Sequence, residues 1–472
     1  MIPCTIQEIC AAVGGTLLQD SPAAITGVTT DSRAVSAGQL FIPLTGERFD
    51  GHAYIDAALT GGAEGCLTAR RPDKLLPHKA YVLVEDTRLA LGALAAWYRS
   101  RFTLPVVQIT GSAGKTTTKE MVAAVLSQRY DTLKTQANYN NDIGTPLTLL
   151  NLTPQHEAAV IETGMNHFGE IRYLGGLVRP DIAVITNVGD AHIENLGNTR
   201  QGILQAKCEI FENLTPEGVA VLNGDDELLN TVTLPRTILR CGVGDGCGVR
   251  VTDIDDRGLE GVACTVTIEG EHYRLTTSAP GRYMIYPMAM AAAIGRRLGL
   301  TGEEIAAGVA AYTTVGSRMH LIRLPGERLV IDDCYNANPA SMKASLDVLA
   351  FADTRKAAIL GDMFELGENE KQMHREVGIH AVRKGIDVLI CIGSLMKSAA
   401  DGALEYLEQQ KNAEHTEETP SSSAHFPTQI CHFATKADFL REAKELLKEG
   451  DTVLVKASHG MEFPEIVGFL QQ

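Results

Sequence analysis

The sequence predicts an α/β protein of three domains, and two observations carry this prediction. At 472 residues the chain is too long for a single hydrophobic core, so roughly three domains are expected. Short apolar runs that suit buried parallel strands alternate with helix-compatible segments along most of the chain. We therefore expect a small α/β domain over residues 1–100, a central parallel-sheet domain of the P-loop ATPase type over 101–315, and a C-terminal Rossmann-like domain over 316–472.

The first boundary is predicted at Leu104-Pro105, because proline ends the preceding element and an apolar strand follows at once. Beyond it, the apolar runs 158–161, 181–186 and 218–222 have the pattern of buried parallel strands. Residues 250–277 differ, since several short β-type runs are joined there by charged turns. We expect an antiparallel excursion at that point of the central domain.

The third domain shows the same alternation of strand-like and helix-like segments. Its predicted strands are residues 329–331, 357–360, 388–392 and 452–455. Residues 409–427 are polar and rich in Glu, Ser and Thr. Because such a composition cannot form a packed core, we expect a mobile loop without a chemical role there.

The most informative segment is residues 106–120, V-V-Q-I-T-G-S-A-G-K-T-T-T-K-E, where an apolar run leads through small residues into a helix-forming segment. Backbone N–H groups of such a loop bind phosphate, Lys115 adds a positive charge, and the Thr116 hydroxyl suits Mg²⁺. The spacing is G-x-x-G-K-T, shorter than the common G-x-x-x-x-G-K-T, because Ile109 stands at the position of the first glycine. The segment predicts binding of ATP or GTP.

Polar side chains follow several of the predicted strands. Glu162 and His192 come after two strands at the sheet edge where the phosphate loop also lies, a place that suits Mg²⁺. Asp332-Asp333 end a third-domain strand before an Asn-Pro turn, as in a ligand-binding strand end. Lys207 lies on a predicted helix, where a solvated lysine is the ordinary interpretation. The asparagine-rich segment 136–146 is either a self-satisfied turn or part of a site.

The composition argues against some classes of function. The formal net charge of −16 argues against nucleic-acid binding, which needs a basic face. The start of the chain lacks a basic segment followed by an apolar core, and no apolar stretch approaches the ~20 residues that span a membrane. The ten cysteines form no C-x-x-C pair and are typical of reduced thiols. We expect a cytoplasmic protein without membrane insertion.

Six motifs occur together in one order along the chain. They are G-S-A-G-K-T-T, N-Y-N-N-D-I-G-T-P, E-T-G, T-N-V-G-D-A-H, A-K-C-E-I-F and D-D-C-Y-N-A-N-P. With these motifs the chain resembles the bacterial Mur ligases, ATP-dependent amino-acid ligases of peptidoglycan precursor synthesis. Y-N-A-N-P is the most specific motif, and G-D-M-F-E-L-G at residues 361–367 supports it. Asp31-Ser32-Arg33 and residues 44–52 are typical of the UDP-sugar-binding module of this family.

The resemblance implies a role for each motif. The implied ATP-binding residues are Gly111, Ser112, Ala113, Gly114, Lys115, Thr116, Thr117, Arg318 and Asp333. Two Mg²⁺ ions are implied, with ligands Thr116, Glu162, His192 and Lys207, the lysine after carbamylation by CO₂. Ser32 and Arg33 would meet the uridine nucleotide, and Asn138, Asn140 and Asn141 would line the muropeptide path. The implied catalytic residues are Lys115, Glu162, His192 and Lys207.

The resemblance also implies the reaction. The substrates would be UDP-N-acetylmuramoyl-tripeptide and D-alanyl-D-alanine, and the product the UDP-N-acetylmuramoyl-pentapeptide precursor of peptidoglycan. The tripeptide carboxylate would attack the γ-phosphate of ATP to give an acyl phosphate and ADP, and the dipeptide amine would then displace phosphate. We expect a monomer that acts in cell-wall biogenesis, and through it in cell shape and division.

Three positions depart from the family pattern. Tyr283 and Pro287 stand where the motif G-R-H-x-x-x-N has His and Asn, and His459 stands where Arg is usual. That Asn normally helps to recognise the nucleotide base, whereas proline offers neither a side-chain amide nor an N–H group. Tyr286 is a neighbour that could serve the base instead.

Alternative functions remain open at this stage. A sister ligase that adds the third amino acid usually carries a D-N-P-R-type motif, which is absent here, and folylpolyglutamate synthase lacks the D-S-R module. A non-catalytic paralogue that binds nucleotide or muropeptide is favoured only by Tyr283 and Pro287. The sequence leaves open the third residue of the acceptor peptide. It also leaves open whether the dipeptide ends in D-Ala, D-Ser or D-lactate.

Overall fold

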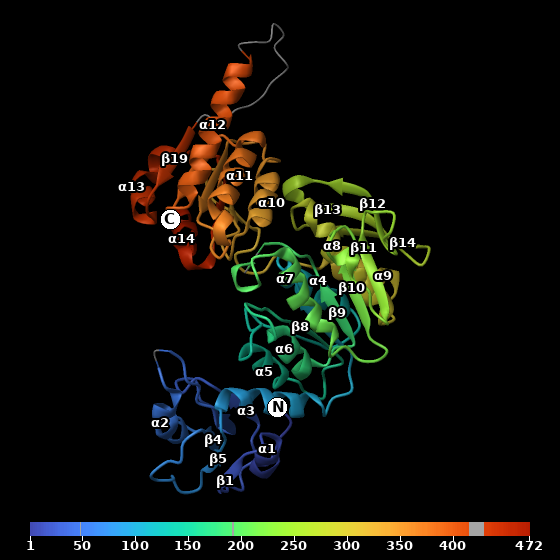
Figure 1. The fold of residues 1–472 in the computed structure, drawn as a ribbon, viewed down its shortest axis with the longest axis vertical. Helices are drawn as coiled ribbons and strands as arrows, with labels where there is room; N and C mark the ends of the chain where they lie inside the picture. Colours follow the sequence, from blue (N-terminus) through green and yellow to red (C-terminus); the bar gives the residue numbers. More distant parts are fainter. Residues whose placement is uncertain (48, 191–192, 415–428) are drawn as a thin grey trace.

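The computed structural model describes residues 1–47, 49–190, 193–414 and 429–472. Its strands form three separate sheets. The molecule is an elongated arc, with the first sheet at one end, the C-terminal sheet at the other and the largest sheet between them (Figure 1). The prediction of a three-domain α/β fold is confirmed.

The first domain is a five-stranded sheet of order β1-β5-β4-β3-β2, in which β1 pairs antiparallel with β5 and the other pairs are parallel. The strands are β1 (Thr16–Gln19), β2 (Gly27–Thr29), β3 (Gln39–Phe41), β4 (Gly65–Thr68) and β5 (Ala80–Leu83). The helices are α1 (Ile6–Ala12), α2 (Ile55–Thr60) and α3 (Thr87–Arg99).

The central domain is built on a nine-stranded sheet of order β14-β13-β12-β11-β10-β9-β6-β8-β7. The strands are β6 (Val106–Thr110), β7 (Thr132–Lys134), β8 (Ala158–Glu162), β9 (Ile182–Ile185), β10 (Val219–Asn223), β11 (Thr237–Gly242), β12 (Val249–Asp256), β13 (Val262–Ile268) and β14 (Glu271–Thr277). The helices are α4 (Lys115–Leu126), α5 (Gly144–Leu149), α6 (Glu170–Val178), α7 (Arg200–Cys208), α8 (Ile285–Arg297) and α9 (Gly302–Ala310). The expected antiparallel excursion is confirmed, since β13 pairs antiparallel with both β12 and β14.

Helix α3 ties the first domain to the central one. Its buried face lies in a single hydrophobic cluster that also contains residues of the first sheet and of β6, β8, α5 and α6. The Tyr98 hydroxyl donates to the Leu152 carbonyl at 2.7 Å, across the junction. Because this core is continuous, we expect the first two domains to move as one body.

The third domain is a six-stranded sheet of order β15-β16-β20-β17-β18-β19. Its strands are β15 (His320–Arg323), β16 (Leu329–Asp332), β17 (Lys356–Gly361), β18 (Val388–Ile392), β19 (Gln429–Phe433) and β20 (Thr452–Lys456). Its helices are α10 (Pro339–Leu349), α11 (Glu370–Arg383), α12 (Met396–Glu414), α13 (Lys436–Leu446) and α14 (Pro464–Leu470). β15 is antiparallel to β16, and the other pairs are parallel, as in a Rossmann-like domain.

The predicted loop over residues 409–427 is partly wrong. Helix α12 continues to Glu414, so residues 409–414 are helical, and residues 415–427 lie outside the described part of the chain. The polar composition of residues 409–414 led to the wrong prediction of a loop, because a long helix that projects from the domain needs apolar residues only where it packs. None of the helices within the described ranges is long and apolar enough to cross a membrane.

The third domain has two hydrophobic clusters of its own and meets the central domain through few side chains. Tyr283 packs against both the central cluster and one cluster of the third domain. Leu259, from the turn between β12 and β13, packs against that same third-domain cluster. This junction is thinner than the continuous core at α3, so the third domain is the part best able to move.

The G-D-M-F-E-L-G segment (residues 361–367) forms a turn around a buried histidine. His374 accepts a hydrogen bond at Nε2 from the Met363 N–H (2.9 Å) and lies 2.7 Å from the Glu370 carbonyl through Nδ1, so the ring is neutral with its proton on Nδ1. Burial lowers the pKa of His374, and the Glu370 carbonyl and the Asp362 and Glu370 charges only partly oppose this.

We expect His374 to make stability depend on pH. The contribution of a group with a lowered pKa is complete above the unfolded value of about 6.5 and is lost as the pH falls below it, at up to about 1.4 kcal/mol per pH unit. The melting temperature of the wild type should therefore fall more steeply between about pH 7 and 5.5 than that of His374→Gln, which cannot take up a proton. If the melting temperatures of the wild type and of His374→Gln fall equally with pH over this range, the role given to His374 is wrong.

Candidate functional site

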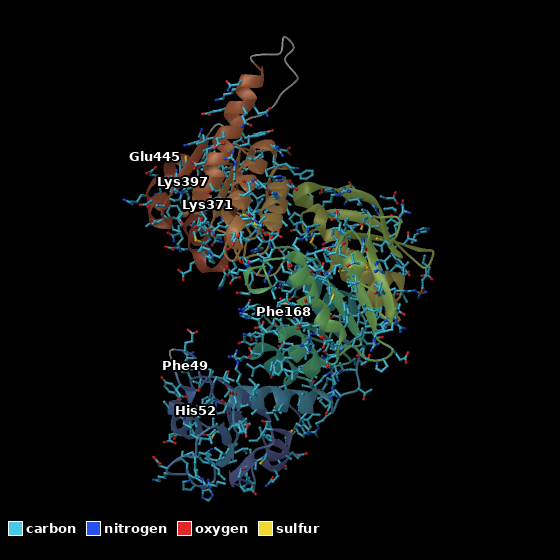
Figure 2. The ribbon with its side chains drawn as sticks, viewed as in Figure 1. Phe49, His52, Phe168, Lys371, Lys397 and Glu445 are labelled. Atoms are coloured by element: carbon cyan, nitrogen blue, oxygen red, sulfur yellow. The ribbon has the colours of Figure 1, made fainter. Side chains whose placement is uncertain are left out.

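The candidate site is a cavity of about 930 Å³ between the central and third domains. The phosphate-loop residues 111–118 line one wall, and residues 333–345 of the third domain line the opposite one. Phe168, which lines the cavity, lies on the inner side of the molecular arc, as does Phe49 of the first domain (Figure 2). The cavity is large enough for a nucleotide and part of a second substrate.

The phosphate loop joins β6 to α4 and has the backbone that its glycines permit. Gly111 and Gly114 have φ values of 156° and 76°, and a Cβ on Gly111 would lie 1.8 Å from the Thr186 hydroxyl. Asn187 holds the loop: its carbonyl accepts from the Ser112 N–H at 3.1 Å, and its side-chain oxygen accepts from the Ala113 N–H at 2.9 Å. The loop therefore presents the N-terminus of α4 to the cavity, as phosphate binding requires.

Lys115 stands at the first position of α4 and lines the cavity. Its Nζ donates to the Gly111 carbonyl at 2.9 Å, which folds the side chain back over the loop. Burial lowers the pKa of Lys115, the Glu162 carboxylate raises it, and the Arg318 guanidinium lowers it. A phosphate group would supply a further anion to stabilise this desolvated cation.

Glu162, the last residue of β8, is 2% exposed and held from several sides. Its Oε2 accepts from the Thr116 hydroxyl at 2.8 Å, and its Oε1 accepts from the Asn140 amide at 2.9 Å. The Lys119 ammonium lies 4.0 Å away, bound to Glu120 and to the Thr135 carbonyl. A hydroxyl and a carboxylate so close beside the phosphate loop form an oxygen donor set that fits Mg²⁺.

Lys207 is buried on α7, with 2% of its surface exposed, so the interpretation as a solvated lysine is wrong. It lines the same cavity as the phosphate loop. Burial, and then the charge of Lys115, hold the pKa of Lys207 well below the usual lysine value. Such an amine is neutral more readily than a solvated one, and a neutral amine is the form that reacts with CO₂.

The asparagine-rich segment is both a turn and part of the site. Asn141 accepts from the N–H groups of Ile143 and Gly144, at 3.2 and 2.8 Å, and so closes the turn. Asn140 points to Glu162, and Asn138 lines the cavity. Both interpretations of the segment therefore hold, for different residues.

Arg318 and Asp333 bring the third domain to the cavity. Arg318 stacks over the Tyr335 ring, with its guanidinium carbon 3.6 Å from the ring centre. Asp333 accepts from the Met319 N–H (3.0 Å), the Ser345 hydroxyl (2.6 Å) and Lys456 Nζ (2.6 Å). These contacts hold the carboxylate firmly at the end of β16.

The departures from the family pattern lie in or beside the cavity. Pro287 is buried in the first turn of α8, where its missing N–H costs nothing. Tyr286 lines the cavity and bonds to Asp225; burial, then the Asp225 charge, raise its pKa to about 12. His459 lies beside Tyr335, with 5.6 Å between ring centres.

Some predicted residues do not reach this cavity. Ser32 and Arg33 follow β2 in the first domain, and the Arg33 side chain is 88% exposed and paired with Asp31 at 2.9 Å. His192 lies outside the described residues, so its position is not given. The cavity thus gathers the described residues that were predicted to bind ATP, together with the asparagines, but not the pair expected to meet uridine.

The structure places at the site two buried lysines that the sequence motifs did not single out. Lys119 neutralises Glu120 and lies near Glu162, and Lys456 is paired with Asp333. Lys119 directly follows the phosphate-loop motif, and Lys456 ends a strand that the apolar pattern predicted one residue short. For Lys456, its place at the end of an apolar run was the available signal, whereas Lys119 ends no apolar run and the sequence offered no such signal for it.

Three segments of the chain match models of the Mur ligases. Residues 24–99 match the Mur ligase family catalytic domain, residues 109–295 the Mur ligase middle domain, and residues 317–459 the Mur ligase glutamate ligase domain. Together the three matches span most of the chain.

The similarity extends to whole proteins. The chain is 37% identical over 471 residues to the UDP-N-acetylmuramoyl-tripeptide–D-alanyl-D-alanine ligase of Bacillus subtilis, covering 99% of this chain and 98% of that one. A crystal structure of MurF from Acinetobacter baumannii is 30% identical, with a TM-score of 0.87 and 99% of each chain covered. MurF from Thermotoga maritima in complex with ADP is 28% identical, with a TM-score of 0.78, covering 94% of this chain and 97% of that one.

Proposed function

The chain belongs to the Mur ligase family of ATP-dependent ligases, and on that premise we propose that it joins D-alanyl-D-alanine to UDP-N-acetylmuramoyl-tripeptide in peptidoglycan synthesis. The observation that carries the proposal is the single cavity in which Lys115 and Glu162 face Arg318 and Asp333. The full-length similarity to ligases of that name supports the choice of substrates.

In the proposed reaction a carboxylate oxygen of the tripeptide attacks the γ-phosphorus of ATP, and ADP leaves. The dipeptide amine then attacks the acyl carbon of the acyl phosphate, phosphate leaves and the amine loses a proton. Negative charge moves between phosphoryl oxygens, so the Lys115 ammonium and the N-terminus of α4 are placed to stabilise it. Closure of the third domain over the nucleotide would exclude water from the acyl phosphate.

We assign magnesium to the Thr116 hydroxyl and the Glu162 carboxylate, with His192 and carbamylated Lys207 as further ligands. Across the described residues no three His, Cys, Asp or Glu side chains are grouped as a complete metal site. Phosphate oxygens and water would therefore complete the coordination, as is usual for Mg²⁺. Bound Mg²⁺ supplies neutralisation of the phosphate charge.

Carbamylation of Lys207 fits the burial of this residue. Attack of its neutral amine on CO₂ forms an N–C bond, releases one proton and leaves an anionic carbamate. The change replaces a cation that lies near Lys115 by an anion, which Lys115 and a metal ion would both attract. Lys207 thus gains its function only after modification.

The predicted domain roles stay part of this proposal. Residues 1–100 bind the uridine nucleotide through Ser32 and Arg33, residues 101–315 bind ATP, and residues 316–472 receive the dipeptide. The shared core at α3 would hold the uridine-nucleotide site and the ATP site at a fixed distance and orientation. We further propose a cytoplasmic monomer with small-molecule substrates only.

We expect Glu162→Ala to abolish ligation, with a loss of about 10³-fold or more, because it removes the carboxylate beside the phosphate loop. Rates measured across a series of Mg²⁺ concentrations should show no recovery at low or moderate magnesium. Glu162→Gln, which keeps the size of the side chain but removes its charge and one of its two acceptor oxygens, should be nearly as inactive. A folded alanine variant with near-wild-type activity would contradict the assignment.

Phosphate release from ATP tests the function as a whole. It should require UDP-N-acetylmuramoyl-tripeptide and D-alanyl-D-alanine together, and mass spectrometry should find the pentapeptide product. Release that depends on a single amino acid in place of the dipeptide would identify a sister ligase. Nucleotide binding without release would identify a non-catalytic paralogue, and would direct attention to Tyr283 and Pro287.

A further inference from the structure

Lys456 is a buried lysine that the proposed reaction does not use. It is the last residue of β20, is 2% exposed and borders the third-domain side of the cavity. Its Nζ lies 2.6 Å from Asp333 Oδ2, and the side chains of this ion pair are 3% and 13% exposed. A cation buried to this degree is kept only where its partners compensate for lost hydration.

The Lys456 ammonium bonds to three oxygens of one short loop. Besides the Asp333 carboxylate, it donates to the carbonyls of Asn336 at 3.1 Å and Asp333 at 3.4 Å. The Asp333 N–H in turn donates to the Val455 carbonyl at 3.0 Å, beside Lys456 on β20. The loop after β16 is therefore folded around this one ammonium group.

The same loop sets the position of Arg318. Asp333 accepts from the N–H of Met319, the residue after Arg318, at 3.0 Å. Tyr335 donates its N–H to the Ser317 carbonyl at 3.0 Å, and its ring carries the Arg318 guanidinium. A shift of Asp333 would therefore move both third-domain groups that face the phosphate loop.

We propose that Lys456 is a positioning residue that holds Asp333 and, through the Tyr335 loop, Arg318 in the geometry that receives the nucleotide. The inference rests on the proposed function, in which Asp333 and Arg318 contact ATP. Without the ammonium, the Asp333 carboxylate would keep two donors among the described residues, the Met319 N–H and the Ser345 hydroxyl, and would turn toward water or take up a proton.

The chain offers a matched control at the other end of β20. Arg355 pairs with Asp451, the residue before β20, at 2.9 Å, and the Asp451 side chain is 1% exposed. Lys456→Met and Arg355→Met each remove the cation of an ion pair at one end of β20 in which one side chain is at most 3% exposed, and both should lower the melting temperature. Only Lys456→Met should weaken binding of Mg²⁺–ADP, by about tenfold or more, when the full chain is titrated by calorimetry.

A double-mutant cycle separates positioning from general damage. If Lys456 acts through Asp333, the ADP affinity of Lys456→Met/Asp333→Asn should match that of the weaker single variant, and KM for ATP should rise more than kcat falls. Lys456→Gln, which keeps a donor without charge, gives the same comparison if the methionine variant does not fold. Wild-type affinity in both Lys456 variants, an equal loss in Arg355→Met, or losses that multiply would overturn the inference. Failure of the wild-type protein to bind ADP would instead overturn the proposed function on which the inference rests.

Discussion

Replacing Lys115 by alanine is expected to lower the rate of ligation by about 10³-fold or more while the protein stays folded. The ammonium group bonds to the loop that is proposed to receive the terminal phosphates, and it lies in a partly buried site where charge is weakly screened. Within the described part of the chain, Lys115 Nζ bonds to the Gly111 carbonyl alone, so the loop of the alanine variant keeps the contacts made by Asn187 and Thr186. Phosphate release at saturating substrates is the measurement.

The melting temperature supplies the control for this variant. Because burial disfavours the charged form of Lys115, the nucleotide-free protein should lose no stability in Lys115→Ala, but the rise in melting temperature on adding ADP should shrink. Lys397→Ala makes the same change on the exposed face of α12, and should alter neither rate nor melting temperature. An active or unfolded Lys115→Ala protein would contradict the role given to this residue.

The parallel strands that the sequence predicts in the central and third domains are those buried on both faces of a sheet, whereas the antiparallel strands of residues 250–277 were predicted from short β-type runs between charged turns. β8, β9, β10, β17, β18 and β20 are continuous apolar runs because helices cover them on both sides. β7, β15 and β19 were not predicted, since they lie at sheet edges and are mostly half-buried. β11 was missed for a related reason: its first four residues are exposed or half-buried and include an arginine.

The residues of the candidate site also fall into two groups, those that the sequence predicted and those that it did not. Lys115, Thr116 and Glu162 could be predicted because each sits at a fixed offset from a strand end, and the strand order brings β6 and β8 side by side. The pairs Lys119–Glu162 and Lys456–Asp333 could not, because their members lie 43 and 123 positions apart in the sequence. Contact between such residues depends on how helices and strands pack together, and a local sequence pattern carries no information about that packing. The burial of Lys207 could not be predicted from the sequence either, because a lysine on a helix is ordinarily solvated.

Lys207→Ala is expected to lose ligation by about 10²- to 10³-fold, because a carbamate at this position would be the anion that holds a second metal ion. The side chain is buried yet borders the cavity, so its removal opens a space that connects to the substrate site. An added short-chain carboxylate such as acetate can enter that space and supply the missing anion. We expect such carboxylates to restore the rate by about tenfold, equivalent to about 1.4 kcal/mol of barrier, in the phosphate-release assay.

Lys115→Ala is the control that gives this rescue its meaning. Both variants remove a lysine that lines the same cavity, but Lys115 is proposed to serve as a cation and cannot be replaced by an anion. Carboxylates should therefore rescue Lys207→Ala and leave Lys115→Ala inactive. Rescue of both would show a nonspecific effect of the added salt, and full activity of Lys207→Ala without any addition would show that the carbamate role is wrong. Rescue confined to Lys207→Ala is the result that an anion at this position requires.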